Sequence, residues 1–181
     1  IVRHVTNISP YLVATDSVIV KKRTTALSEV GHMQSGNKPT DNGNLILSRE
    51  DKDVIVNQFP QASKFVKRYV GSREIINGGG RWCLWLEDND IPSALEIKPI
   101  QRRIENVYTF RANSQGKQAN ENADNSHRFV FAPHSPGIAI AVPNASSERR
   151  EYLPCEITNA FTVISNLASV IYNASIWNMA L

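Results

Sequence analysis

The chain has 181 residues, which suits one ordinary domain and excludes a repeat array or a large multidomain enzyme. Its 41% hydrophobic and 20% charged residues, with nine Gly and nine Pro, are typical of a globular protein and exclude disordered, collagen-like and coiled-coil classes. The net charge of +3 permits a polyanionic partner but does not require one.

The two cysteines, Cys83 and Cys155, are too few for a disulfide framework, and the chain does not start with a signal peptide. We therefore expect two buried free thiols and a reducing, cytoplasmic location. Residues 157–181 carry no charge, but asparagines and serines interrupt the roughly 20 apolar residues that a membrane span needs. This favours buried strands and no membrane partner. The start on Ile1 and the end inside an apolar run suggest a fragment of a larger protein.

The first predicted elements are a short strand at residues 18–20 and a long ordered loop at residues 31–44. Residues 48–51 resemble a capping box, which predicts a short helix that ends at Pro60. Pro60 then begins a second predicted helix. The apolar face of that second helix would consist of Ala62, Phe65, Val66 and Tyr69.

A triple glycine precedes the next predicted element. Residues 77–80 predict a turn, and residues 81–86 predict a central strand with large side chains on both faces. A glycine-rich turn can also cradle a phosphate. This one lacks the Lys-Ser/Thr pair of a P-loop and precedes a strand where a helix would be needed, so we favour the plain turn.

A longer helix opens at residues 90–93, and Pro99 limits its regular part to about residues 99–113. Residues 98–118 contain five basic residues and one acidic residue, the strongest electrostatic feature of the chain. Two interpretations remain open. The basic residues either form a solvated face near a helix C-terminus, where the macrodipole favours cations, or contact a nucleic acid.

Most strands are predicted in the second half. Residues 112–126 hold no large apolar side chain, so we expect this connection to be poorly ordered without a ligand. Strand-like segments follow at residues 127–131, 138–142, 152–153, 161–164 and 168–172. The predicted fold is α+β, with short N-terminal helices, one longer basic helix, and a mixed or largely antiparallel sheet built mainly from the second half.

The signatures of catalysis are absent from the sequence. There is no HExxH, no paired CxxC, no GxSxG, and no GxGxxG that follows a strand and opens a helix. We therefore predict no catalytic residue, metal site or cofactor site in this chain, and structural roles for its four histidines. The remaining candidate for a binding site is a loop at residues 143–152. Its hydroxyl groups can bind phosphate, its carboxylates can accept hydrogen bonds from base amines, and its guanidinium groups can bind guanine or phosphate.

Five sequence blocks give the chain a family resemblance. They are residues 8–12 (ISPYL), 33–45 (MQSGNKPTDNGNL), 71–78 (GSREIING), 81–86 (RWCLWL) and 146–154 (SSERREYLP). In this order they resemble the MmeI-like type IIG restriction-modification proteins. The resemblance implies that residues 1–181 are a target recognition domain, which reads double-stranded DNA.

The resemblance also implies a larger parent enzyme. An adenine-specific, S-adenosylmethionine-dependent DNA methyltransferase domain would precede this domain in the same chain, with or without a nuclease domain. The methylated adenine would be flipped out of the duplex. A helical C-terminal part would follow, because the chain ends before the family's Ser-x-x-His segment.

The resemblance carries a set of site residues over to this sequence, and the basic helix region adds Lys117. The DNA-binding candidates are Ser146, Ser147, Glu148, Arg149, Arg150, Arg111, Ser114, Lys117, Asn37 and Lys38. One or both loop arginines could instead lock the loop through Glu148. Two rival functions also remain: an RNA-binding module that uses the same basic helix, and a structural module that docks against a neighbouring domain.

Overall fold

The computed structural model describes residues 4–10, 12–16, 19, 22 and 31–179, and it divides into two units, residues 1–30 and 31–181. In the first unit the amide of Ser9 donates to the carbonyl oxygen of Val13 (2.9 Å), which closes a turn. Residues 18 and 20 of the predicted first strand lie outside the described residues. The remaining elements all belong to the second unit.

The strands of the second unit are β1 (Gln34–Ser35), β2 (Ile46–Leu47), β3 (Val66–Val70), β4 (Arg81–Leu84), β5 (Ala139–Pro143), β6 (Glu156–Thr158), β7 (Thr162–Ile164) and β8 (Ala168–Tyr172). The helices are α1 (Arg49–Gln58), α2 (Ser72–Asn77), α3 (Ile91–Leu95), α4 (Lys98–Ala112) and α5 (Lys117–Glu121). Three 3-10 helices complete the list: η1 (Pro60–Phe65), η2 (Asp88–Asp90) and η3 (Ile176–Met179).

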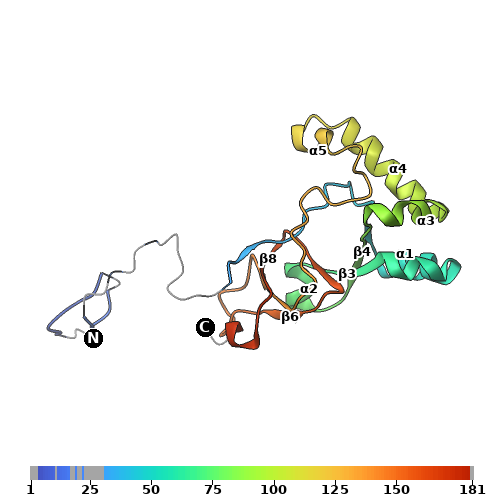
Figure 1. The fold of residues 1–181 in the computed structure, drawn as a ribbon. Helices are drawn as coiled ribbons and strands as arrows, with labels where there is room; N and C mark the ends of the chain where they lie inside the picture. The colour runs from blue at the N-terminus through green and yellow to red at the C-terminus, as the bar shows by residue number, and fades with distance from the viewer. Residues whose placement is uncertain (1–3, 11, 17–18, 20–21, 23–30, 180–181) are drawn as a thin grey trace. The chain divides into compact units, whose positions relative to one another are not determined.

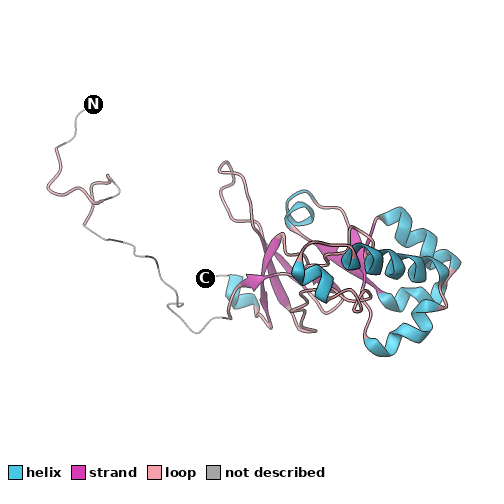
Figure 2. Ribbon diagram, turned by 90° about the horizontal axis from the view of Figure 1, so that it is seen from above, coloured by secondary structure: helices cyan, strands magenta, loops and turns pink. Residues whose placement is uncertain are grey.

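The strands form two four-stranded sheets. One sheet has the order β1-β8-β5-β6 and is antiparallel throughout; the other has the order β2-β4-β3-β7 and is antiparallel except for the parallel pair β3–β7. Most of the helical residues gather at one end of this unit, beside β4, and the strands lie toward the other (Figures 1 and 2). The α+β class is confirmed, with two sheets in which the first half of the chain supplies β1 to β4.

Several predicted elements are confirmed in place. Helix α1 begins with a complete capping box, in which Ser48 Oγ accepts from the Asp51 amide (3.0 Å) and the Asp51 carboxylate accepts from the Ser48 amide (3.4 Å). Helix α4 occupies nearly the span predicted for the basic helix. Strand β4 is central, between β2 and β3, and the strands predicted near residues 138, 161 and 168 are β5, β7 and β8.

The predicted second helix is wrong. Only residues 60–65 are helical, as a short 3-10 turn, and residues 66–70 form the strand β3. Val66 and Tyr69 are three residues apart, which suits one helical face, yet Val66 pairs with Leu84 and Tyr69 with Arg81 and Val163. Pairing on both edges with strands distant in the sequence has overridden the local helical pattern.

Two predicted strands are also wrong, and one of the predicted buried thiols is exposed. Residues 127–131 form no strand in the described structure and take part only in an isolated β-bridge, between Phe131 and Lys38, and residues 152–153 lie in a loop. Cys83 is buried as predicted, and burial raises the pKa of its thiol. Cys155 is exposed because it ends that same loop. Within the described ranges, no helix is long and apolar enough to span a membrane.

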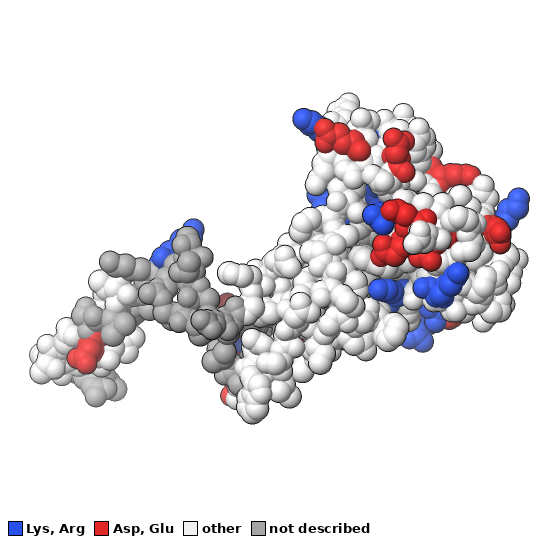
Figure 3. All heavy atoms as spheres, viewed as in Figure 1, with Lys and Arg blue, Asp and Glu red and all other residues white. Residues whose placement is uncertain are grey.

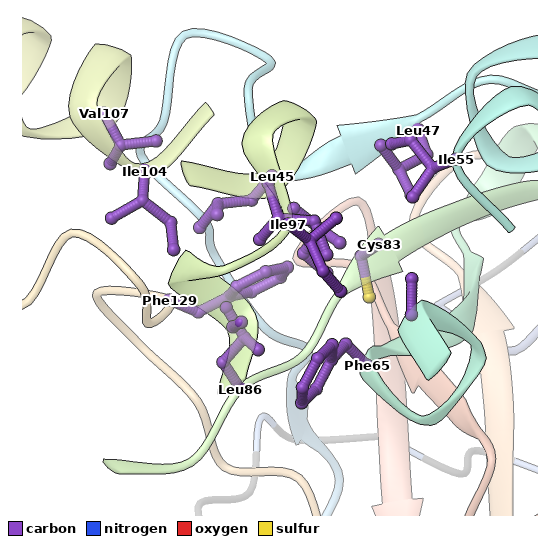
Figure 4. Packing of buried hydrophobic residues seen from close by; sticks show 14 of the residues in the cluster. Leu45, Leu47, Ile55, Phe65, Cys83, Leu86, Ile97, Ile104, Val107 and Phe129 are labelled. Atoms are coloured by element: carbon purple, nitrogen blue, oxygen red, sulfur yellow. The ribbon is translucent and has the colours of Figure 1, made fainter. Parts of the chain in front are cut away.

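The main core lies between the helices and the sheet that contains β4 (Figure 4). Its members come from the helices α1, η1, α3 and α4, from strands β2, β3, β4 and β7 and the residues that flank them, and from the segment after α5. Fully buried large side chains at its centre include Leu45, Leu47, Phe65, Leu84, Ile97 and Ile100. Each such side chain contributes about 1.5–3 kcal/mol by leaving water, so this core holds α4 firmly on the sheet.

A second, smaller core joins the two sheets. Its six buried members are Ala139 and Ala141 of β5, Ala168 and Val170 of β8, and Val70 and Ile164 from the other sheet. Three of the six are alanines, so small side chains make up half of this contact. The contact links the β5–β6 hairpin to the sheet that packs against the helices.

A buried ion pair holds α2 against β4. Glu74 accepts two hydrogen bonds from Arg81 (2.8 and 2.9 Å) and one from the Gly71 amide (2.9 Å). Burial alone would raise the pKa of Glu74, but these hydrogen bonds outweigh it and the pKa is lowered. Glu74 therefore stays ionised in the folded protein.

This ion pair should make the stability of the fold pH-dependent. Because the folded-state pKa of Glu74 is lower than its unfolded value of about 4.3, the stabilisation is complete above that value and is lost as the pH falls through the folded pKa. We expect Glu74→Gln to lower the free energy of unfolding most at pH 7, with the difference from wild type shrinking toward pH 3. Urea titrations of both proteins at the two pH values measure it. An equal difference at both pH values would contradict the assignment.

Candidate nucleic-acid interface

The loop between β5 and β6 carries the predicted Ser-Ser-Glu-Arg-Arg block. Asn144 fixes its base: the backbone amide donates to Ser72 Oγ (3.0 Å), the side-chain amide donates to the Asn166 carbonyl (3.2 Å), and the side-chain carbonyl accepts from Ser169 Oγ (2.9 Å). These three bonds tie the loop to α2, to the β7–β8 turn and to β8. Residues 145–153 extend beyond this base and are all exposed.

The tip of the loop has a local turn. Ser147 Oγ accepts from the Arg149 amide (3.2 Å) and the Ser147 carbonyl accepts from the Arg150 amide (3.1 Å). Among the described residues, the side chains of Glu148, Arg149 and Arg150 have no hydrogen-bond or ion-pair partner. The alternative in which Glu148 locks an arginine is therefore not observed, and the loop presents both guanidinium groups and the carboxylate to solvent.

Arg111 does not lie where the sequence placed it. We expected it to line the DNA path, but its side chain is fully buried, with an exposed fraction of 0%. All five of its N–H donors bind backbone carbonyl oxygens, namely those of Pro39, Thr40, Asn122, Asn125 and Arg128, at 2.7–3.1 Å. Burial lowers the pKa of Arg111, and the nearby Asp41 carboxylate opposes that shift. A guanidinium with every donor occupied leaves none for a phosphate, so Arg111 is a structural residue.

The bonds of Arg111 also correct the prediction that residues 112–126 are poorly ordered. This connection contains α5. The segment that follows α5 is fixed by hydrogen bonds from Arg111 to the carbonyl oxygens of Asn122 and Asn125. Lys117, at the start of α5, is exposed and forms a 3.7 Å ion pair with Glu121. Ser114 is half-buried, and its hydroxyl accepts from the Gly116 amide (3.1 Å). These two residues remain candidates for contact with DNA.

The prediction that Asn37 contacts DNA is likewise corrected. It is fully buried; its side-chain amide donates to the Ile164 carbonyl (2.8 Å) and the Tyr172 hydroxyl (3.0 Å), and its side-chain carbonyl accepts from the His134 amide (3.1 Å). The preceding Gly36 lies so close to the carbonyl oxygens of Ile164 and Ser165 that a Cβ atom would overlap them. Asn37 therefore ties the two sheets together, and only its neighbour Lys38 is exposed to a ligand.

Trp82 of β4 and Trp85, which follows this strand, are both half-buried. Lys52 Nζ lies 4.7 Å from the ring centroid of Trp82, and Lys67 Nζ lies 5.3 Å from that of Trp85. Lys67 and Trp85 line a cavity of about 400 Å³, where Lys67 also approaches His134 Nε2 (3.3 Å). Burial lowers the pKa of both Lys67 and His134. Because a lysine covers each indole, neither offers a free platform on which a single-stranded base could stack.

Charge does not mark one broad binding surface on the face drawn in Figure 3. On this face, acidic and basic side chains are intermixed over the helical end, and the part over the sheets carries almost no charge. In the described part of the chain, no group of three or more His, Cys, Asp or Glu residues could hold a metal ion. The exposed loop is thus the most distinctive cluster of binding groups.

Comparison with known proteins identifies the family of this chain. The family described as "MmeI, target recognition domain" matches residues 14–181, nearly the whole chain. The chain belongs to this family. The resemblance drawn from the five sequence blocks is confirmed.

Two relatives of the MmeI target recognition domain illustrate the match. DNA methyltransferase A of Bacillus subtilis (strain 168) is 35% identical over 173 residues, which are 96% of this chain and 20% of that protein. A solved structure of the Type IIL restriction-modification enzyme MmeI in complex with DNA is 33% identical, with a TM-score of 0.79, and the match covers 94% of this chain and 23% of that one. This chain therefore spans about a fifth of the length of these relatives.

For this MmeI-type domain, the sequence identified the exposed loop but missed the residues around its base. Arg73 is exposed next to Ser72, whose hydroxyl contacts both the Asn144 amide and the Leu167 carbonyl. Arg73 belongs to GSREIING, one of the five blocks that carry the family resemblance, so the sequence did contain a signal for this residue. Its proximity to the loop was not predictable, since Ser72 and Asn144 are 72 positions apart.

Proposed function

We propose that this chain reads a specific base sequence in double-stranded DNA for a methyltransferase domain of the same polypeptide, within a restriction-modification system. The observation that carries the proposal is the anchored β5–β6 loop, which presents two arginines, a carboxylate and two serines to solvent; neither arginine side chain has a partner among the described residues. Membership of the MmeI target recognition domain family supports it, as does the relative solved in complex with DNA.

The roles within the loop follow from the chemistry of its side chains. Arg149 and Arg150 suit the two acceptors of guanine in the major groove or a phosphate, because a guanidinium donates two parallel hydrogen bonds. Glu148 suits an exocyclic base amine, and Ser146 and Ser147 suit phosphate oxygens. Bidentate base contacts would specify sequence, and the phosphate contacts would set the register of the domain on the duplex.

Three exposed or half-exposed residues outside this loop are further candidate contacts. We assign Lys38, Ser114 and Lys117 to the DNA path, because none of them is fully buried. Asn37 and Arg111 would support them from the interior: Asn37 precedes Lys38, and Arg111 binds the carbonyls of Pro39, next to Lys38, and of Asn122, just after the helix that begins at Lys117. The proposed interface is thus a set of exposed groups on a buried hydrogen-bonded frame.

We assign the chemistry of the parent enzyme to other parts of the polypeptide. The proposed parent is an adenine-specific methyltransferase that uses S-adenosylmethionine, with or without a nuclease domain. The relative named DNA methyltransferase A supports the methyltransferase assignment. The sequence of this chain contributes no catalytic motif, so its part in the reaction is recognition.

One observation favours a docking role beside the DNA contacts. Tyr152 and Leu153 follow the arginines in the same loop and are 79% and 63% exposed. Two adjacent apolar side chains at such exposure are available for contact with a protein partner. We assign this second half of the loop to the neighbouring methyltransferase domain, which would place the arginine turn between that domain and the duplex.

Selection from a random duplex library tests the proposed function. The 181-residue chain should enrich a fixed set of base pairs, and its affinity should fall steeply with salt, by a log–log slope of about −0.9 per phosphate contact. A single-stranded RNA of equal length provides the competitor. Recovery of random sequences with no salt dependence, or stronger binding to the RNA, would overturn the proposal.

A further inference from the structure

A polar groove runs along α4. Its lining residues are distant in the sequence from the β5–β6 loop. One part, of about 560 Å³, is lined by Asn44, Lys98, Pro99, Arg102, Arg103 and Asn106. The next part, of about 590 Å³, is lined by Asn42, Asn44, Asn106, Thr109, Phe110, Asn113 and Ser114. Asn44 and Asn106 belong to both parts and are joined by a hydrogen bond (3.2 Å), so the two parts are continuous. We call the whole the α4 groove.

The lining of the α4 groove is cationic and rich in amides. It contains three basic side chains and four asparagines, and neither part is lined by a carboxylate. Arg103 is engaged by the carbonyl of Asn44 and by Asp51, which fixes the wall of the groove. Lys98 and Arg102 are exposed and have no ion-pair partner among the described residues. The nearest acid on the helix, Glu105, accepts from Gln101 instead.

Stabilisation of the helix does not explain the position of these cations on α4. Lys98 is the first residue of α4 and Arg102 follows one turn later, at the end where the macrodipole is positive and disfavours cations. Helix α1 has the usual arrangement, with Glu50 and Asp51 in its first turn, whereas the first turn of α4 has no acid. The interpretation of a solvated basic face near the C-terminus therefore does not explain Lys98 and Arg102.

The spacing of the stripe suits a polyanion. Lys98, Arg102 and Asn106 are four residues apart, so they lie on one helical face and cover about 12 Å at 1.5 Å per residue. Duplex DNA carries one charge per about 1.7 Å of its axis, so a stripe of this length faces several phosphates. Cations and side-chain amides are the groups that proteins use on phosphate oxygens.

We infer that the α4 groove binds the phosphodiester backbone of duplex DNA, as a sequence-independent clamp separate from the β5–β6 loop. Lys98 and Arg102 supply the charge, and Asn106 and Asn113 supply neutral donors. The inference rests on the proposed function. It adds a second contact that fixes the domain on the duplex and reads no bases.

The test is the salt dependence of binding to a 30-base-pair duplex of arbitrary sequence. Wild type is compared with Lys98→Ala/Arg102→Ala and with a control, Arg49→Ala/Lys64→Ala, which removes the same charge from exposed positions outside the groove. We expect the groove variant to lower the steepness of the log–log slope by about 1.8, for two lost phosphate contacts. The control should change it much less. Arg102→Lys should keep most of the wild-type slope.

The outcomes separate this inference from the function on which it rests. If wild type binds the duplex but both double variants have the same slope, the groove assignment is overturned and the proposed function stands. If wild type binds no duplex at all, both fail. Circular dichroism melting of each variant checks the fold. If the double variant unfolds, the single substitution Arg102→Gln at this exposed position replaces it and should lower the slope by about 0.9, and an unchanged slope would overturn the groove assignment.

Discussion

Replacing Arg111 with Met is expected to lower the free energy of unfolding by about 3–5 kcal/mol. The side chain is fully buried and donates to five backbone carbonyls, and each buried acceptor left without a donor costs about 1–3 kcal/mol, less where water can enter. Domains of this size are stable by only about 5–15 kcal/mol, so the loss is a large part of the total. Urea unfolding followed by circular dichroism measures the change.

The graded variant Arg111→Lys distinguishes hydrogen bonding from simple loss of volume. A lysine has three donors and no planar fork, so at least two of the five carbonyls stay unpaired and an intermediate loss is expected. Lys117→Ala is the matched surface control, since its side chain is 88% exposed, and we expect a change within about 0.5 kcal/mol. Equal stability of wild type and Arg111→Met would show that the carbonyls find other partners.

The buried environment of Arg111 could not be predicted from the sequence. In the sequence it is one of several arginines and lysines around the basic helix, and a basic side chain before a polar connection suggests a surface contact. Its actual environment is made by Pro39, Thr40 and Arg128, whose carbonyls converge only when distant segments fold together. Polar donors buried in this way depend on tertiary structure, which local patterns of hydrophobicity and charge do not encode.

Elements with strong local signals were predictable. The capping box at Ser48 and Asp51, the proline at the start of α4, and the β-branched runs of β7 and β8 each determine their own conformation. Strand β3 was not predictable, because its residues also fit a helix and its conformation is settled by β4 and β7 on either side. The same reasoning applies to the site. The exposed loop could be located from its sequence, whereas its anchoring by Asn144 to α2 and the β7–β8 turn could not.

The second large effect is expected at the tip of the loop. Arg149→Ala and Arg150→Ala should each leave the stability of the fold unchanged within about 0.5 kcal/mol, because both side chains are exposed and unpaired among the described residues. If an arginine reads a guanine, its removal should reduce discrimination between the selected duplex and one with a changed base pair. A bidentate contact contributes about 1–3 kcal/mol, so the expected loss is roughly 5- to 150-fold.

Lysine substitutions at the same positions separate base reading from phosphate binding. Arg149→Lys and Arg150→Lys keep the charge but lose the planar fork. A residue that reads a base should lose discrimination as lysine while keeping the salt slope, whereas a residue that binds phosphate should keep both as lysine and lose about 0.9 of slope as alanine. Fluorescence anisotropy with the two duplexes over a salt series gives both quantities. If all four variants keep wild-type discrimination and slope, the loop does not touch DNA, and the recognition surface must then be sought at other exposed residues.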